Sequence, residues 1–210
     1  MAYTLTNHVP LRVTDAEFRQ AYNTAIGMCT SAVFILSRYL AGRANSRQSN
    51  CVVTAFQEAE RGSAYDITAH ANIASKILQN YQTVKNTVLP TARFEITNDA
   101  GVWGISPNCI NGPTPILSGV LIRVGEGWIS SGSDACTYAS RLRRHVSRGQ
   151  ARIALRATTL IHESMHYIVG LGHGRHANHN PYFYEFFVLN IRFGEGFADM
   201  ETELETGAQA

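Results

Sequence analysis

Thr158-Thr-Leu-Ile-His-Glu-Ser-Met-His166 is the most informative stretch of this 210-residue chain. It contains His162 and His166, which stand four positions apart, with Glu163 directly after the first. In a helix, side chains four residues apart lie one turn above each other on one face. Two imidazoles placed in this way can share one metal ion, most often zinc, and the neighbouring glutamate can act as a general base on water. The stretch therefore predicts a zinc site with His162 and His166 as ligands and Glu163 as the catalytic base.

The residues around this motif predict a largely buried helix over residues 151–169. Its apolar members recur at helical spacing on both sides of the motif: Ile153, Leu155, Leu160, Ile161, Ile168 and Val169. Burying two imidazoles and a carboxylate without partners would be costly, which favours a functional site. The alternative is a pair of ordinary histidines whose hydrogen bonds are satisfied inside the protein, because the bare pattern also occurs by chance.

Composition and charge limit the classes to which the chain can belong. With 45% apolar and 16% charged residues it is globular, and 210 residues suffice for one sizeable core. The formal net charge of +2 provides no general reason to bind nucleic acid or a charged membrane. No apolar run reaches the roughly 18 residues of a transmembrane helix. We expect a monomer whose partner is a protein or peptide substrate, with no nucleic acid and no membrane span.

The cellular compartment is suggested by four cysteines, Cys29, Cys51, Cys109 and Cys136. None forms a Cys-x-x-Cys pair, so a thiolate zinc site is not predicted. We favour the disulfides Cys29–Cys51 and Cys109–Cys136, and the alternative is four buried thiols in a cytosolic protein. A low lysine content also favours an extracytoplasmic setting. Because the first ten residues do not form a classical signal peptide, we expect secretion or export by another route, as for a bacterial toxin or effector.

The predicted fold class is α+β, with a helical part over residues 1–90 and strands added in residues 91–210, or one single domain over 1–210. The predicted helices cover residues 15–40, 50–61, 66–89, 151–169, 182–190 and 194–205, and residues 133–149 are expected to form a helix or a helix and a turn. The predicted strands cover residues 93–97 and 119–124, with 1–14 as a strand or extended arm and 101–115 as a loop rich in Gly, Pro and Asn.

Arginines recur every three or four positions ahead of the motif. They are Arg141, Arg144, Arg148, Arg152 and Arg156. The favoured interpretation is a solvated helix face, and the alternative is a contact with an anionic substrate or surface. No aromatic residues are interleaved with them, which argues against single-stranded nucleic acid.

A catalytic zinc ion needs a third protein ligand, and that ligand should follow the motif. The candidates are His173, His176, His179, Glu185 and Glu195. His173 lies one position too late for the metzincin pattern. Glu185 follows His166 by 18 intervening residues, and Glu195 follows it by 28.

Glu195-Gly-Phe-Ala-Asp199 resembles the second motif of the gluzincins, whose glutamate binds zinc at the start of a helix. In some gluzincins an acid four residues later orients a histidine ligand. The resemblance implies Glu195 as the third ligand and Asp199 as the orienting acid. It also implies a zincin-like fold. The separation of Glu185 from the motif is similar to that in one gluzincin branch.

Residues 157–166 also resemble the active helix of deuterolysin-type peptidases, the aspzincins. The third ligand of that family is an Asp in a Gly-Thr-x-Asp segment, which this chain lacks. Strands just before the metal-binding helix suit zinc peptidases, where an edge strand can pair with an extended peptide.

Together these features predict a zinc-dependent metallopeptidase that hydrolyses peptide bonds with a metal-activated water. Tyr182, Tyr184 or His176 could stabilise the transition state. The alternatives are an amidase or effector acting on cell-wall peptide, and a non-catalytic protein that binds a metal.

Overall fold

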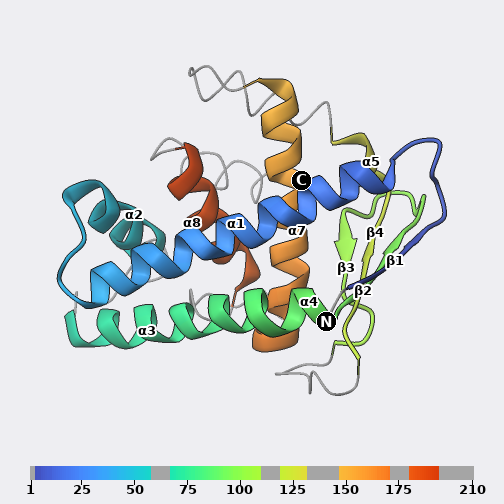
Figure 1. Ribbon diagram of the computed structural model, residues 1–210. Helices are drawn as coiled ribbons and strands as arrows, with labels where there is room; N and C mark the ends of the chain where they lie inside the picture. Colours follow the sequence, from blue (N-terminus) through green and yellow to red (C-terminus); the bar gives the residue numbers. More distant parts are fainter. Residues whose placement is uncertain (1–2, 58–66, 110–118, 132–146, 171–179, 194–210) are drawn as a thin grey trace, which may run out of the picture.

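The computed structural model describes residues 3–57, 67–109, 119–131, 147–170 and 180–193, and it has an α+β architecture (Figure 1). Helix α7 lies between helices α2, α3 and α8 on one side and a small sheet on the other. The helices are α1 (Asp15–Leu40), α2 (Ser46–Gln57), α3 (Ile67–Thr83), the π-helix η2 (Val84–Val88), α4 (Leu89–Thr91), α5 (Glu126–Ser130), α7 (Arg148–Val169) and α8 (Pro181–Phe193). The strands are β1 (Thr4–Asn7), β2 (Arg93–Ile96), β3 (Gly104–Ile105) and β4 (Leu121–Val124).

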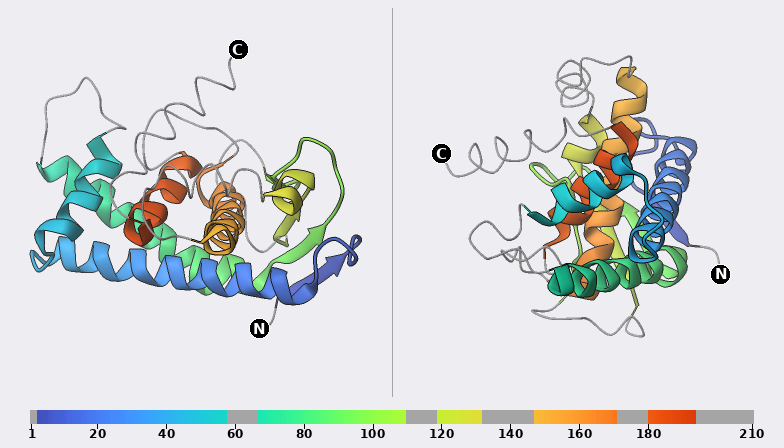
Figure 2. Two further views of the ribbon diagram at one scale, coloured as in Figure 1. Left: turned by 90° about the horizontal axis from the view of Figure 1, so that it is seen from above. Right: turned by 90° about the vertical axis from the view of Figure 1, so that its left-hand side faces the viewer.

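Helix α1 begins where the sequence predicts. The Thr14 hydroxyl accepts a hydrogen bond from the Glu17 N–H, and the Glu17 carboxylate accepts one from the Thr14 N–H, which is a capping box. The helix then runs along the molecule and crosses α7, with the sheet near its start and α2 near its end (Figure 2). Its buried residues recur every three or four positions, so one face packs against the other helices.

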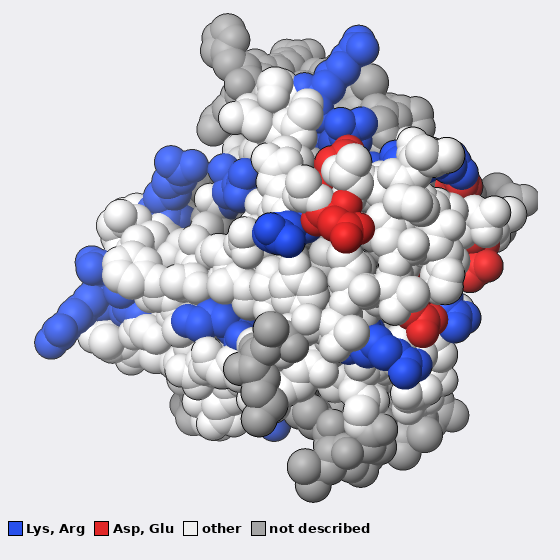
Figure 3. Space-filling model, turned by 45° about the vertical axis from the view of Figure 1, so that its right-hand side comes forward, with Lys and Arg blue, Asp and Glu red and all other residues white. Residues whose placement is uncertain are grey.

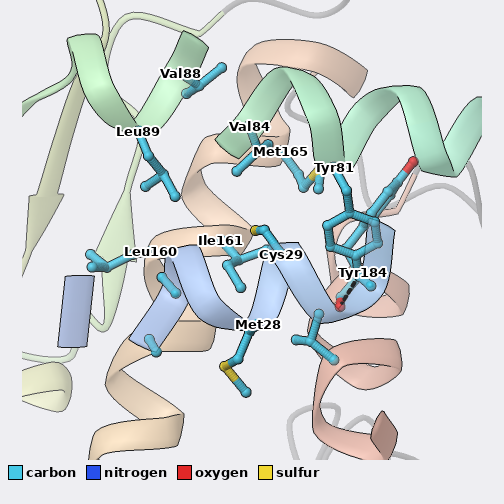
Figure 4. Close-up of a cluster of buried hydrophobic side chains, with 14 of the residues drawn as sticks. Met28, Cys29, Tyr81, Val84, Val88, Leu89, Leu160, Ile161, Met165 and Tyr184 are labelled. Carbon is cyan, nitrogen blue, oxygen red and sulfur yellow. Dashed lines mark hydrogen bonds between the residues drawn. The ribbon is translucent and has the colours of Figure 1, made fainter. Parts of the chain in front are cut away.

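Apolar side chains from α1, η2, α7 and α8 form one hydrophobic core (Figure 4). Cys29 of α1 lies beside Ile161 and Met165 of α7. The Tyr81 hydroxyl of α3 donates a hydrogen bond to the carbonyl oxygen of Tyr184 in α8. Helices from residues 1–90 and from the motif region therefore share this core.

The sheet has the order β1-β2-β4-β3, in which β1, β2 and β4 are parallel and β3 is antiparallel to β4. The side chains on its inner face are fully buried in β2 and β4: Phe94, Ile96, Ile122 and Val124. On the outer face, an Arg123 nitrogen lies 2.9 Å from a Glu95 oxygen. Gly104 of β3 pairs with Val124, so it belongs to the inner face, which lies against α7.

Two polar side chains of α7 fix the position of the sheet region beside the helix. The Arg156 guanidinium donates hydrogen bonds to the carbonyl oxygens of Trp128 (3.0 Å) and Ile129 (2.7 Å), and it lies 4.7 Å from the Trp128 ring centroid. The Tyr167 hydroxyl donates to the Leu121 carbonyl oxygen (2.6 Å) and accepts from the Leu121 N–H (2.9 Å). Strand β4 is thus held in one register against α7.

Two sequence-based expectations are wrong in this region. Strand β3 falls within residues 101–115, which were expected to form a loop, because two residues are too short to show the alternation of a strand. Arg156 does not belong to a solvated stripe, since only 3% of it is exposed, although Arg148 and Arg152 are exposed.

The predicted Cys29–Cys51 disulfide is also wrong. Cys29 is a free, fully buried thiol, and burial raises its pKa to about 12. The Cys51 sulfur instead lies 4.0 Å from the carbonyl oxygen of Asn190 in α8. The two cysteines therefore pack against different helices, and apolar surroundings suit both thiols. Cys136 of the second predicted pair lies outside the described residues.

In the view of Figure 3, basic side chains are scattered over the whole face, and the acidic ones lie in its right-hand half, some of them beside basic side chains. An ion pair joins Arg12 and Glu126. None of the helices that the structure describes combines the length and the apolar character needed to cross a lipid bilayer.

Candidate functional site

The motif lies in the last two turns of α7, and the end of the helix shapes the site. A capping box of Ser147 and Gln150 starts this helix. It ends at Gly170, whose φ of 91° lies in the left-handed region that favours glycine. This turn brings the Gly170 carbonyl oxygen to 2.8 Å from Nδ1 of His166. The helix terminus therefore orients the second histidine of the motif.

The structure brings His162, Glu163 and His166 together. One nitrogen of each imidazole and one oxygen of the carboxylate all lie within 4.8 Å of one another. The two rings are 4.9 Å apart at their centroids. The three residues are only 7%, 5% and 6% exposed, respectively. Helical spacing alone produces this clustering, as the sequence predicts.

The partners of the two imidazoles determine which nitrogen of each can bind a metal. Nδ1 of His166 faces the Gly170 carbonyl oxygen, which makes it the protonated nitrogen of a neutral ring. Nδ1 of His162 lies 3.4 Å from a carboxylate oxygen of Glu185. A carbonyl or carboxylate on Nδ1 is the usual arrangement behind a metal-binding histidine, since it fixes the tautomer and the ring orientation. Since Nδ1 of each ring faces an oxygen atom, Nε2 of each ring is the nitrogen that would bind a metal.

Two side chains of helix α8 contact the imidazole ring of His162. Tyr182 and Glu185 stand one turn apart on this helix, and both contact His162: the Tyr182 ring is edge-on to the imidazole, with 4.6 Å between centroids. Tyr184 points into the core instead, where its hydroxyl accepts a hydrogen bond from the Asn80 amide. Of the two tyrosines considered as transition-state donors, Tyr182 is thus the one beside the motif.

The carboxylate of Glu163 is enclosed by the end of strand β3. The Ser106 hydroxyl lies 2.7 Å from Oε2 of Glu163 and 2.8 Å from its carbonyl oxygen. Gly104 lies so close that an added Cβ would stand 2.7 Å from Cγ and from Oε1 of Glu163. The predicted base therefore contacts two residues of the sheet edge as well as its own helix.

Burial and charge act in opposite directions on the ionisable groups of the site. Burial raises the pKa of Glu163, and the nearby His162 and the Ser106 hydrogen bond offset only part of this effect. Burial alone would lower the pKa of His162, but the carboxylates of Glu185 and Glu163 outweigh it, so this pKa is raised. A glutamate with a raised pKa is better matched to accept a proton near neutral pH.

The remaining candidate residues fall outside the described part of the chain. They are His173, His176, His179, Glu195 and Asp199. Sequence reasoning missed Ser106 and Gly104, which lie 57 and 59 positions before Glu163. A serine among Gly, Pro and Asn residues is typical of a loop, so the sequence around these two residues carries no signal of a site.

Comparison with known proteins gives no family assignment. The chain matches no protein-family model, no curated protein and no solved structure.

Proposed function

We propose that this protein is a zinc-dependent metallopeptidase with a zincin-like arrangement of its active helix. One observation carries the proposal: both imidazoles of the motif have Nδ1 facing an oxygen atom, and an oxygen of the buried Glu163 carboxylate lies within 4.8 Å of a nitrogen of each ring. A pair of histidines with only a structural role has no need of this shared orientation. A buried Glu163 beside them is costly unless it has a function.

The donor set fits zinc, which prefers nitrogen and carboxylate ligands in a tetrahedral site. His162 and His166 would hold the ion through Nε2. We propose Glu195 as the third ligand, with Asp199 as an orienting acid, from the resemblance of their segment to the gluzincin second motif. Glu185 contacts the far side of the His162 ring, so we assign it the orientation of that ligand.

The chemistry then follows from the side chains around the ion. When bound, zinc supplies a Lewis acid that makes a water molecule acidic enough to lose a proton near neutral pH. Glu163 accepts that proton and can deliver it to the leaving amine. Tyr182, 38% exposed and next to His162, is the described residue best placed to donate a hydrogen bond to the developing oxyanion.

Strand β3 supports an extended peptide as the substrate. It stands at one end of the strand order among the described strands, beside Glu163. The Gly125 N–H donates to the Trp103 carbonyl oxygen, so the alternation of an antiparallel ladder directs the N–H and C=O of Gly104 away from β4. These groups can pair with a peptide strand and hold its backbone beside the base.

The test is hydrolysis of denatured casein by the zinc-loaded protein and by Glu163→Gln. The variant should keep its zinc and its fold but lose about 10²–10⁴-fold in turnover, as is typical when a general base is removed. Glu95→Gln, on the outer face of the sheet, is the matched control and should retain activity. Near wild-type turnover in Glu163→Gln excludes this mechanism, and zinc binding without any hydrolysis supports the non-catalytic alternative.

A further inference from the structure

Strand β3 and the residue after it contact the side chain of Glu163 from two directions. We propose that Ser106 is a positioning residue for Glu163, and that Gly104 keeps open the space into which the carboxylate fits. This inference rests on the proposed peptidase function, because it assigns these two residues to the base of that reaction.

The hydroxyl of Ser106 bridges the backbone and the side chain of a single residue. Its oxygen lies 2.8 Å from the Glu163 carbonyl oxygen and 2.7 Å from Oε2, and Ser106 is only 6% exposed. A side chain held relative to its own backbone has few rotamers left. Ser106 therefore fixes the direction in which the carboxylate points.

Gly104 limits the same side chain from the other direction. An alanine Cβ at this position would stand 2.7 Å from Oε1 and Cγ of Glu163 and 2.8 Å from a methyl carbon of Thr159. Such distances require one of the groups to move. Glycine is thus the residue that lets the strand approach the base this closely.

The strand alternation explains why both residues face the helix. Gly104 and Ser106 are two positions apart and share one side of the strand, whereas Ile105 between them points outward and is 37% exposed. The paired strand β4 is held against α7 by the hydroxyl of Tyr167. The position of the base is therefore set by the sheet as well as by its own helix.

The two oxygens of the carboxylate have different surroundings. Oε2 contacts the hydroxyl of Ser106, and we assign to Oε1 the proton taken from water. Oε1 is also the oxygen next to the space that a side chain at position 104 would fill. A base whose reactive oxygen is held in place loses less rate to misorientation.

The experiment compares Ser106→Ala with Ser164→Ala in the full-length zinc-loaded protein. Ser164 is also buried and adjacent to Glu163, but its hydroxyl donates to the Leu160 carbonyl oxygen instead. Ser106→Ala should lower kcat by roughly 10–100-fold, with KM and zinc content unchanged. Ser164→Ala should leave kcat near that of the wild type, and Ser106→Thr, which keeps the hydroxyl, should restore part of the loss.

Steady-state kinetics separate positioning from general damage, because a misplaced base lowers kcat without changing substrate binding. Unchanged kcat in Ser106→Ala would overturn the proposal.

Melting temperatures provide a readout that does not need activity. Ser106→Ala should lower the melting temperature more in the wild type, where it leaves a buried carboxylate without this donor, than in Glu163→Ala. Equal losses in the two backgrounds would contradict the contact. If the coupling is present but the wild type hydrolyses nothing, the peptidase function fails while the contact between Ser106 and Glu163 stands.

Discussion

The two sides of α7 are built in different ways. The side toward α1 and η2 is apolar, with Ile161 and Met165 packed beside Cys29 (Figure 4). The side toward the sheet carries Arg156, Glu163 and Tyr167, and each of these makes hydrogen bonds to the segment that it faces. Both sides are almost completely buried.

The apolar side of α7 contributes mainly to stability, and the polar side sets how the sheet is aligned with the helix. Apolar contacts are non-directional, so they hold α7 against the other helices without selecting one position along it. Hydrogen bonds need defined distances and angles. The bond between Tyr167 and Leu121 of β4 and the bond between Ser106 and Glu163 therefore select one alignment of sheet and helix. We therefore expect changes on the apolar side to reduce stability, and changes on the polar side to reduce catalysis as well.

The largest expected loss of stability comes from the apolar side. Ile161→Ala removes a fully buried side chain and leaves a cavity, which should lower the free energy of unfolding by about 2–5 kcal/mol. Ile161→Val should cost only about 0.5–1.5 kcal/mol. Denaturant unfolding measures both values. Activity per folded molecule should be retained, and a selective loss of kcat in Ile161→Val would contradict the separation of the two sides.

Arg156→Met should have the next largest effect. It keeps much of the side-chain volume but leaves the buried carbonyl oxygens of Trp128 and Ile129 without their donor, at about 1–3 kcal/mol. Glu17→Gln is the control. The Glu17 contact to Arg156 is 3.4 Å and partly exposed, and glutamine can still complete the capping box, so this change should cost less than about 1 kcal/mol. Equal losses would mean that the ion pair, rather than the carbonyl contacts, holds the arginine.

Tyr167→Phe should lower the stability less than Arg156→Met, but it should also lower kcat. It removes one hydroxyl that bonds both backbone groups of Leu121, an expected loss of about 1–2 kcal/mol. Strand β3 pairs with β4, and the end of β3 contacts Glu163. A shift of β4 should therefore lower kcat more than Ile161→Val does, although Tyr167 lies a full turn beyond Glu163. Burial is the main reason that the pKa of Tyr167 is raised to about 12, so the effect should be constant between pH 6 and pH 9. Unchanged kcat in folded Tyr167→Phe would show that β4 does not need this bond to hold β3.

The same contrast explains which features could be predicted from the sequence. The motif helix, its two histidines and the start of α1 depend on spacings of three or four residues, and the structure has them where they were expected. The site also depends on contacts between distant segments. Ser106 reaches Glu163 only because β3 pairs with β4. Strand β3 has two residues, which is too few for a local pattern to predict that pairing.

The disulfide prediction failed for a related reason. Cys29 and Cys51 are close in sequence, and they lie on adjacent helices. Whether two thiols meet depends on the direction of each side chain, and Cys29 points into the central core while Cys51 points toward α8. Local spacing carries no information on that direction.

The last prediction has the smallest expected effect and the opposite sign. In the metal-free protein, burial raises the pKa of Glu163, so ionising it costs more in the folded than in the unfolded state. This cost is absent below the unfolded pKa and grows as the pH rises toward the folded pKa. Glutamine cannot ionise, so Glu163→Gln should gain stability relative to the wild type as the pH increases.

His162 strengthens the same trend. Its raised pKa adds stability at low pH that is lost as the pH rises through the folded value, and part of that stability comes from Glu163. The variant should therefore be no more stable than the wild type at pH 4 but more stable at pH 8. Melting temperatures in chelator at several pH values measure the difference, with Glu95→Gln as the control. A difference that stays constant or shrinks with rising pH would show that Glu163 is not a strained base, because a buried carboxylate kept for its reactivity should weaken the fold most at the pH where it is ionised.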